Sequence, residues 1–351
     1  MTFHLSVLPA GDGDCLLLAF GDGDERRHVV VDGGRAGAYK HLRSRLETIR
    51  DAGGKLDLLV LTHIDADHIK GVLEIAKDKN LPLRPERVWY NGYDQMGGIQ
   101  PFSFPQGDQY SRLIGDLGWD LNPGFGDRPV SIETRPAPFD FEGMTITLLS
   151  PDAAKLAALR SKWQAWRTAD AAKIAAKELK AGVQAMGRSK MPEVLDVDAL
   201  AAPTPTDPEP PNGSSIAFIA EWKGRRVLLA GDAHPDLLVS SLAPLAKAAG
   251  GRLPIDLLKV PHHGSKGNTT RELVELLDCR RFLLSTDGKR HGHPDPEAIA
   301  RLLAFAPTGA KALYFNYRTE RTEPWGDNEL MAKYGYDATF GQPDGILDIE
   351  I

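Results

Sequence analysis

Residues 56–61, LDLLVL, form an apolar run, and the polar sequence THIDADHIKG follows directly at residues 62–71. A continuous apolar strand needs both faces of its sheet covered, which predicts helices packed outside the sheet. The turn that follows holds two histidines and two aspartates within six positions, and a helical pattern begins behind it. Four side chains that can bind a metal ion therefore converge at the end of a buried strand.

The remaining chain alternates apolar strand patterns with helical ones in two similar halves. Strands are expected in the first half at residues 3–8, 15–20, 28–34 and 56–63, and helices at 36–52 and 68–78. In the second half we expect strands at 144–150, 214–222, 226–232, 255–263, 281–288 and 311–317, with helices at 235–249, 269–278 and 295–305. This order predicts an α/β protein whose sheets lie between helical layers.

Acidic and histidine residues recur where these strands end: Asp32, His63, Asp232, His262 and His263. Any one of them alone is most simply a polar loop residue, and Asp65 or Asp67 alone is most simply a helix cap. The spacing H-x-D-x-D-H at the end of a strand instead favours a metal site. Histidine and carboxylate ligands suit zinc, and a larger share of oxygen ligands shifts the preference towards manganese.

Two segments interrupt the pattern. Residues 91–140 are rich in glycine, proline and aromatic residues, which predicts a mostly irregular insertion. Residues 152–211 form a basic helical insertion with a proline-rich connector, APTPTDPEPPNG, at its end. Between residues 152 and 191 this insertion holds nine basic residues against three acidic ones.

Length, charge and cysteine content limit the kinds of protein that this chain can be. A chain of 351 residues that is 42% hydrophobic buries a large core, and we expect residues 1–351 to form a single domain. A net charge of −6 argues against general coating of nucleic acid. The two cysteines indicate free buried thiols. Without a signal-like start or a long apolar run, the chain is expected in the cytoplasm with no membrane partner.

Six segments, in this order along the chain, resemble the metallo-β-lactamase-fold hydrolases, and especially the soluble domain of ComEC-type DNA-uptake proteins and their stand-alone relatives. They are GDGDCLLLAF, VVVDGG, LTHIDADHIKGV, NGSSIAFIAEWKGRRVLLAGD, LLKVPHHGSKGN and DGKRHGHPDPEAIARL. The resemblance covers residues 5–316 apart from the insertions. It implies a four-layer αββα sandwich, the metallo-β-lactamase fold, here carrying a helical insertion.

The resemblance also implies a metal centre of one or two Zn²⁺ ions, with Mn²⁺ as the alternative. His63 and Asp65 would hold one ion, Asp67 and His68 the other, and Asp232 would bridge both. His263 matches the late histidine of the family pattern, with His262 as its substitute or supporting partner. Asp32 would orient ligands from behind.

This sequence departs from the family pattern at two places. Asp65 stands where the superfamily usually has a histidine, and the histidine of the third motif is absent. Asn212, Ser214 or Ser215 would fill that gap weakly, in the segment PPNGSS. The expected catalytic residues are Asp67, His262 and His293, with His293 as a proton donor or phosphate ligand; a loop-capping role for His293 is the alternative.

The resemblance favours a metal-dependent hydrolase of phosphodiesters, acting through a metal-activated water without a serine or cysteine nucleophile. The expected partner is an anionic substrate such as single-stranded DNA or RNA, which the basic insertion with Trp163 and Trp166 would guide. Packing of these tryptophans onto the protein is the competing interpretation. The alternatives are hydrolysis of a small ester, lactone or phosphocholine-like diester, and a binding or regulatory protein with a degraded site.

Overall fold

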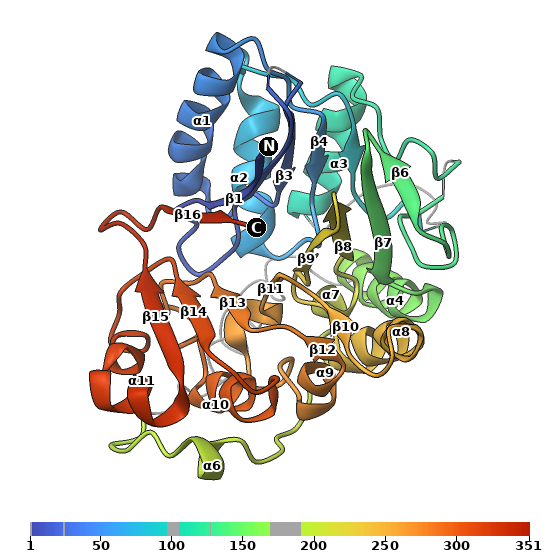
Figure 1. The fold of residues 1–351 in the computed structure, drawn as a ribbon. Helices are drawn as coiled ribbons and strands as arrows, with labels where there is room; N and C mark the ends of the chain where they lie inside the picture. Colours follow the sequence, from blue (N-terminus) through green and yellow to red (C-terminus); the bar gives the residue numbers. More distant parts are fainter. Residues whose placement is uncertain (1, 24, 97–104, 127, 169–190) are drawn as a thin grey trace.

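A computed structural model describes residues 2–23, 25–96, 105–126, 128–168 and 191–351, and its strands form two large sheets (Figure 1). The first sheet has six strands in the order β16-β1-β2-β3-β4-β5. It is antiparallel from β16 to β3 and parallel from β3 to β5. The bounds are β1 (Thr2–Val7), β2 (Leu16–Gly21), β3 (Arg27–Val31), β4 (Leu58–Val60), β5 (Val88–Trp89) and β16 (Leu347–Glu350).

The second sheet has eight strands in the order β15-β14-β13-β11-β9-β8-β7-β6. Pairing is antiparallel from β6 to β9 and parallel from β9 to β15. The bounds are β6 (Phe139–Phe141), β7 (Met144–Ser150), β8 (Ala217–Trp222), β9 (Arg225–Leu229), β11 (Leu257–Lys259), β13 (Arg281–Leu284), β14 (Lys311–Phe315) and β15 (Tyr336–Phe340). A separate pair joins β10 (Leu253–Pro254) and β12 (Leu277–Asp278).

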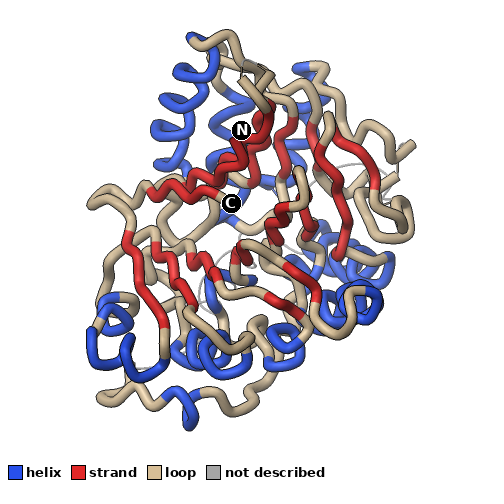
Figure 2. Tube along the Cα trace, in the orientation of Figure 1, coloured by secondary structure: helices blue, strands red, loops and turns tan. Residues whose placement is uncertain are grey.

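Helices cover the outer face of each sheet (Figure 2). The first sheet packs against α1 (Tyr39–Asp51), α2 (Ala66–Lys77), α3 (Pro105–Leu117) and α4 (Ala153–Thr168). The second packs against α8 (Pro235–Ala248), α9 (Arg271–Glu275), α10 (Pro296–Phe305) and α11 (Asn328–Tyr334). Shorter pieces are η1 (Ala36–Ala38), α6 (Val197–Leu200), α7 (Pro210–Gly213), η2 (Pro261–Gly264) and η3 (Glu323–Gly326).

Three apolar cores lie between these layers. One joins the inner faces of the sheets through residues such as Leu18 and Leu283, and the other two lie between each sheet and its helices. Strands buried on both faces explain the continuous apolar runs of the sequence. In α1 the buried residues Leu42, Leu46 and Ile49 recur at helical spacing and form a single apolar stripe. The predicted four-layer αββα sandwich is confirmed.

The insertions differ in detail from the expectation. Within residues 91–140, helix α3 and the start of β6 form regular structure, and most of the other described residues are irregular. Tyr110 and Ile114 of α3, four residues apart, are buried in the core outside the first sheet and fix this helix there. Of the basic insertion, α4 is described to residue 168, and residues 169–190 lie outside the described part. The short helix α6 lies just before the proline-rich connector, and α7 forms its end. No helix of the described segments has the length and apolar character needed to cross a bilayer.

Candidate metal centre

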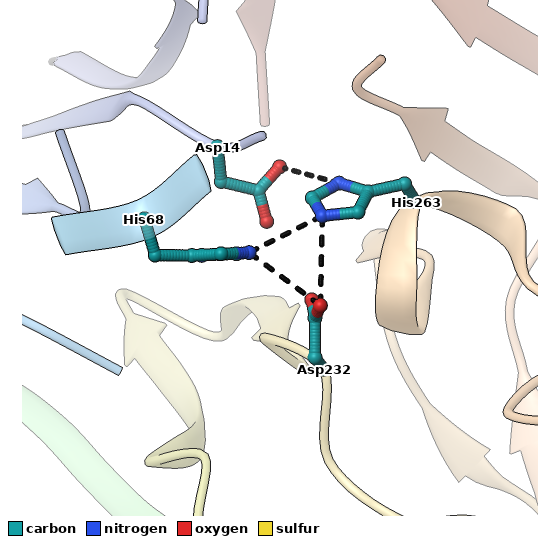
Figure 3. A group of neighbouring side chains, drawn as sticks. All are labelled: Asp14, His68, Asp232 and His263. Atoms are coloured by element: carbon teal, nitrogen blue, oxygen red, sulfur yellow. Dashed lines mark hydrogen bonds and ion pairs between the residues drawn. The ribbon is translucent and has the colours of Figure 1, made fainter. Parts of the chain in front are cut away.

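Segments that follow strands of both sheets meet at a buried group of histidines and aspartates (Figure 3). His68 lies in the first turn of α2 behind β4, Asp232 follows β9, His263 lies in η2 behind β11, and Asp14 precedes β2. Ligand atoms from these four residues all lie within 4.8 Å of one another. The topology therefore brings chain positions far apart in sequence to one point.

The hydrogen bonds of His68 and His263 fix which ring nitrogen is free. Nδ1 of His68 lies 2.8 Å from Oδ2 of Asp32, and Nδ1 of His263 lies 2.9 Å from the carbonyl oxygen of Ser285. Both partners are acceptors, so each Nδ1 carries the hydrogen and donates it. The Nε2 atoms then face each other at 3.2 Å as lone pairs, 3.4 and 3.5 Å from Oδ2 of Asp232. This arrangement is repulsive unless a proton or a metal ion lies between the atoms.

The ring of His63 is oriented in the same way, with Nδ1 as the donor. Thr62 donates its hydroxyl to Oδ2 of Asp32 at 2.7 Å, so its oxygen accepts from Nδ1 of His63 at 3.0 Å. Nε2 of His63 is buried without a hydrogen-bond partner among the described residues. It lies 3.8 Å from Oδ2 of Asp232 and 3.9 Å from Oδ2 of Asp65. Leaving such a nitrogen unsatisfied costs about 1–3 kcal/mol, which points to a partner bound at this position.

The remaining predicted ligand, Asp67, faces the other side of the centre. Its Oδ2 lies 3.8 Å from Nε2 of His263, while Asp65 faces His63. Asp232 lies between the two sets, and its Oδ1 is buried without a hydrogen bond to the described residues. The structure thus brings the six predicted metal ligands together, with Asp232 between the two sets.

Asp32 holds the centre from behind. Its carboxylate accepts from the Thr62 amide at 2.8 Å, from the Thr62 hydroxyl and from His68. Its backbone is left-handed, with φ of 60°, a conformation in which aspartate is several-fold enriched among non-glycine residues. Asp32 therefore lies where it can orient the ligands, in the position that the resemblance implies.

Two close backbone approaches set the position of α2. A Cβ atom on Gly71 would lie 1.8 Å from the carbonyl oxygen of Gly33, and one on Gly13 would lie 1.7 Å from that of Asp67. Only glycine fits at such distances. The glycines of the GDGD and VDGG segments therefore let α2, with Asp67 and His68, lie directly against the strand ends.

The turn η2 places two consecutive histidines in the centre. His262 and His263 both adopt left-handed conformations, with φ of 47° and 55°. Each costs about 1–3 kcal/mol in a residue other than glycine, and such strain persists where the surroundings enforce it. In this turn both rings reach Asp232, His263 at 3.5 Å and His262 at 3.7 Å from Nε2 to Oδ2. The sequence alternatives for the late ligand are thus both present.

Sequence reasoning missed two supporting carboxylates. Oδ2 of Asp207, in the proline-rich connector, lies 3.1 Å from Nδ1 of His262 and accepts from Asn268. Asp14 forms a buried ion pair with Lys259, and its Oδ1 lies 3.5 Å from Nδ1 of His263. Lys259 could have indicated the Asp14 carboxylate from the sequence, because a lysine within an apolar strand needs a buried counter-ion.

Electrostatics in the centre favour a bound cation. Although burial opposes it, the Asp232 and Asp32 carboxylates raise the pKa of His68 well above its usual value. Asp232 and Asp207 likewise outweigh burial and raise the pKa of His262 to about 9. Burial and the neighbouring His68 lower the pKa of His63 to about 3. Protons on His68 and His262 therefore occupy the place that a metal ion would take.

The donor set fits divalent metal ions. Imidazole nitrogens freed at Nε2 and oriented at Nδ1, together with carboxylates, are the ligands of zinc-class ions in proteins. His293 is buried at the edge of the centre, with its ring centroid 5.3 Å from that of His262 and its Nδ1 3.5 Å from Oδ2 of Asp295. The candidate residue His293 is therefore near the centre without being part of either ligand set.

The sequence pattern of the metallo-beta-lactamase superfamily matches residues 8–288. ComE operon protein 3 of Bacillus subtilis (strain 168) is 28% identical over 132 residues, which is 37% of this chain and 16% of that protein. Exodeoxyribonuclease YycJ of Bacillus anthracis is 30% identical over 123 residues, 33% of this chain and 43% of that protein. The chain thus spans less than half the length of either relative.

Among solved structures, a mutant of CmlA beta-hydroxylase aligns with a TM-score of 0.42 at 13% identity, covering 99% of this chain and 54% of that one. The superfamily match itself extends over more than half of the sequence and includes the predicted ligands His63, Asp65, Asp67, His68, Asp232 and His263. On this match the chain belongs to the metallo-beta-lactamase superfamily of metal-dependent hydrolases.

Proposed function

We propose that the protein is a metal-dependent phosphodiesterase that cleaves nucleic acid, with single-stranded DNA or RNA as substrate. One observation carries the proposal: two sets of histidine and aspartate ligands face each other across Asp232. The partial similarity to a relative named as an exodeoxyribonuclease supports the choice of nucleic acid. Zn²⁺, as one or two ions, is the proposed cofactor, with Mn²⁺ as the alternative.

A pair of divalent ions at this centre supplies Lewis acidity and an acidified water for displacement at phosphorus. The residues of the chain fix both positions, since Asp232 reaches both ligand sets. His293 is the proposed proton-transfer group. Burial lowers its pKa, so the ring is neutral at pH 7 and its Nε2 atom accepts a proton. Asp295, beside Nδ1, orients the ring.

Cationic residues near the centre support an anionic substrate. Lys289, which pairs with Asp287 at 3.4 Å, and Arg290 are exposed in the loop that leads to His291 and His293. Nε2 of His291 lies 3.5 Å from the Asp12 carboxylate, which Arg35 also binds. A phosphate chain that crosses this loop would meet positive charge beside the ligands.

The basic insertion gives weaker support. Trp163 is fully buried, with its ring centroid 5.7 Å from that of Tyr93, so it packs against the protein and is not available to stack on bases. Lys155 and Lys162 form ion pairs with Asp236 and Glu209. The side chain of Trp166 and the basic residues between 173 and 190 lie outside the described part.

A small-molecule substrate is less well supported. An aromatic pocket in residues 91–126 would favour such a substrate. The described aromatic side chains there are buried in the cores: Tyr93, Tyr110, Trp119 and Phe125. They therefore stabilise the fold, and they do not line an open pocket.

The test compares protein loaded with zinc or manganese on single-stranded DNA, RNA, cyclic dinucleotides and bis-p-nitrophenyl phosphate. Wild type should hydrolyse at least one nucleic acid and the chromogenic diester. Asp232→Ala should abolish both activities, because the shared ligand is lost. If fully metal-loaded wild type cleaves none of these phosphodiesters, the protein is not a phosphodiesterase.

A second variant tests the nucleic-acid substrate. The double variant Lys289→Ala/Arg290→Ala should slow DNA cleavage. It should also lower the magnitude of the slope of log binding constant against log salt concentration by about 0.7 for each lost phosphate contact. Hydrolysis of the chromogenic diester should stay unchanged. Lys247→Ala, an exposed lysine near the end of α8, is the matched control and should have no effect. An unchanged salt slope in the double variant would favour a small diester.

A further inference from the structure

The absent third-motif histidine raises the question of what fills its place. The three candidates from the segment PPNGSS make other contacts. Nδ2 of Asn212 donates to Asp207 at 2.7 Å, and Ser214 donates to the carbonyl of Pro211 at 2.6 Å. Oγ of Ser215 contacts Nδ1 of His63 at 3.2 Å and accepts from the Asp232 amide. These contacts make the segment a support for the ligands.

His262 reaches the centre from another direction. Its Nε2 atom lies 3.7 Å from Oδ2 of Asp232, comparable to the 3.8 Å from Nε2 of His63 to the same oxygen. The left-handed turn η2 permits this, because it directs His262 and His263 towards Asp232 from adjacent positions. His263 faces Asp67 and His68, the second ligand set. His262 is therefore the additional imidazole at the shared carboxylate.

The other ring nitrogen of His262 is held by two acceptors. Nδ1 lies 3.1 Å from Oδ2 of Asp207 and 3.0 Å from Oδ1 of Asn268. The amide of Asn268 donates to Asp207 and to the Asp232 carbonyl, which fixes Oδ1 as its accepting end. Nδ1 of His262 must then carry a hydrogen, which makes Nε2 the nitrogen that can bind an ion. A carboxylate behind an imidazole is the usual support of a metal-binding histidine.

We propose that His262 is the second nitrogen ligand of the first metal position, beside His63, where it replaces the absent histidine, and that Asp207 and Asn268 hold it there. The inference rests on the metal centre of the proposed function and not on its substrate. Each position then has two histidines, one aspartate of its own and a share of Asp232. The two positions are chemically alike, so two ions should bind with similar affinity.

The experiment titrates metal-free protein with Co²⁺ and follows stoichiometry by calorimetry and ligand-field absorption. Wild type should bind two ions. His262→Ala should bind one ion as wild type does and the other at least 10-fold more weakly. Asp207→Asn should weaken one ion by about 10–100-fold. His234→Ala is the matched control, because His234 lies 4.0 Å from Asp207 with its Nδ1 directed to Lys155, and it should bind two ions unchanged.

Double variants test which of the two metal positions His262 serves. His262→Ala combined with His63→Ala should lose only one ion, since both residues serve the same position, whereas combination with His263→Ala should lose both. If circular dichroism shows that His262→Ala does not fold, His262→Gln is measured in its place. Two tightly bound ions in both His262 variants, or no ion in wild type, would overturn the inference. Because Co²⁺ binding is measured without substrate, absence of phosphodiesterase activity alone would leave it intact.

Discussion

Four histidines of the centre are oriented in the same way, with Nδ1 tied to an acceptor and Nε2 left for an ion. The acceptors are Thr62 for His63, Asp32 for His68, Asp207 and Asn268 for His262, and Ser285 for His263. An imidazole already fixed in its binding orientation loses little freedom when the ion binds. Metal affinity should therefore depend on these acceptors as well as on the histidines.

Asp32 offers a direct test of this dependence. Asp32→Asn should preserve the left-handed backbone, since asparagine also tolerates φ of 60°. The amide has one accepting oxygen and a donating NH2 group. It therefore cannot replace both Oδ1, which accepts from the Thr62 amide, and Oδ2, which accepts from the Thr62 hydroxyl and from His68. We expect metal affinity to fall by about 10–100-fold, measured by competition with a chromogenic chelator.

The control for Asp32 is another buried aspartate outside the centre. Asp57 accepts from the His28 amide at 2.8 Å and pairs with Arg27. Asp57→Asn should lower thermal stability and leave metal affinity unchanged. Equal losses of affinity in both variants would show that the effect of Asp32 is general destabilisation.

The candidate ligands that the sequence could indicate lie close together in the chain or follow apolar strands. His63, Asp65, Asp67 and His68 share one turn, so their meeting requires no knowledge of the fold. Asp207 could not be predicted, because it meets His262 across 55 residues and lies among prolines like an ordinary loop carboxylate. Residue type shows that a side chain can support a ligand, but only the path of the chain shows that it does.

Helix α2 is the element on which the centre depends most, because its first turn carries Asp67 and His68. Gly71→Ala would normally favour a helix by about 1 kcal/mol. Here the new methyl group would meet the carbonyl oxygen of Gly33 at 1.8 Å and force α2 away from β3. We expect a lower melting temperature and loss of tightly bound metal, measured by thermal denaturation and elemental analysis.

Gly115 in α3 provides the matched control, since a Cβ atom there meets nothing within 4 Å. Gly115→Ala should raise stability slightly and keep the metal. If Gly71→Ala behaves like Gly115→Ala, the close approach of α2 to β3 does not position the centre.

At the scale of elements, long apolar segments were predictable and short or mixed ones were not. The expected strand at residues 144–150 coincides with β7. By contrast, β5, β10 and β12 each have two residues, too few to show any periodicity. Helix α3 was missed because the glycines and prolines around it obscured the spacing of Tyr110 and Ile114.

For the whole molecule, alternating strands and helices predicted the layers but not the order of the strands. β16 pairs with β1, joining the two ends of the described chain in one sheet (Figure 1). Ser6, for example, donates to Asp348 across 342 residues. No local pattern encodes a contact of that separation, so the order of the first sheet had to come from the structure.

The pairing of β16 leads to a prediction for the whole fold. Deleting residues 347–351 removes Leu347, Ile349 and Ile351 from the core between the sheets and leaves the edge of β1 unpaired. We expect a lower melting temperature and concentration-dependent aggregation, followed by light scattering, because exposed strand edges template intermolecular pairing. Glu350→Ala, at an exposed position of the same strand, should behave as wild type.

The same pairing sets an order of events during synthesis. Strand β1 leaves the ribosome first, but its edge partner β16 comes only after about 340 further residues, which takes roughly 20–70 s at common elongation rates. Over that interval β1 can pair with β2 alone, and its other edge stays open to neighbouring nascent chains. The longer this wait, the longer newly made chain is exposed to aggregation before the first sheet is complete.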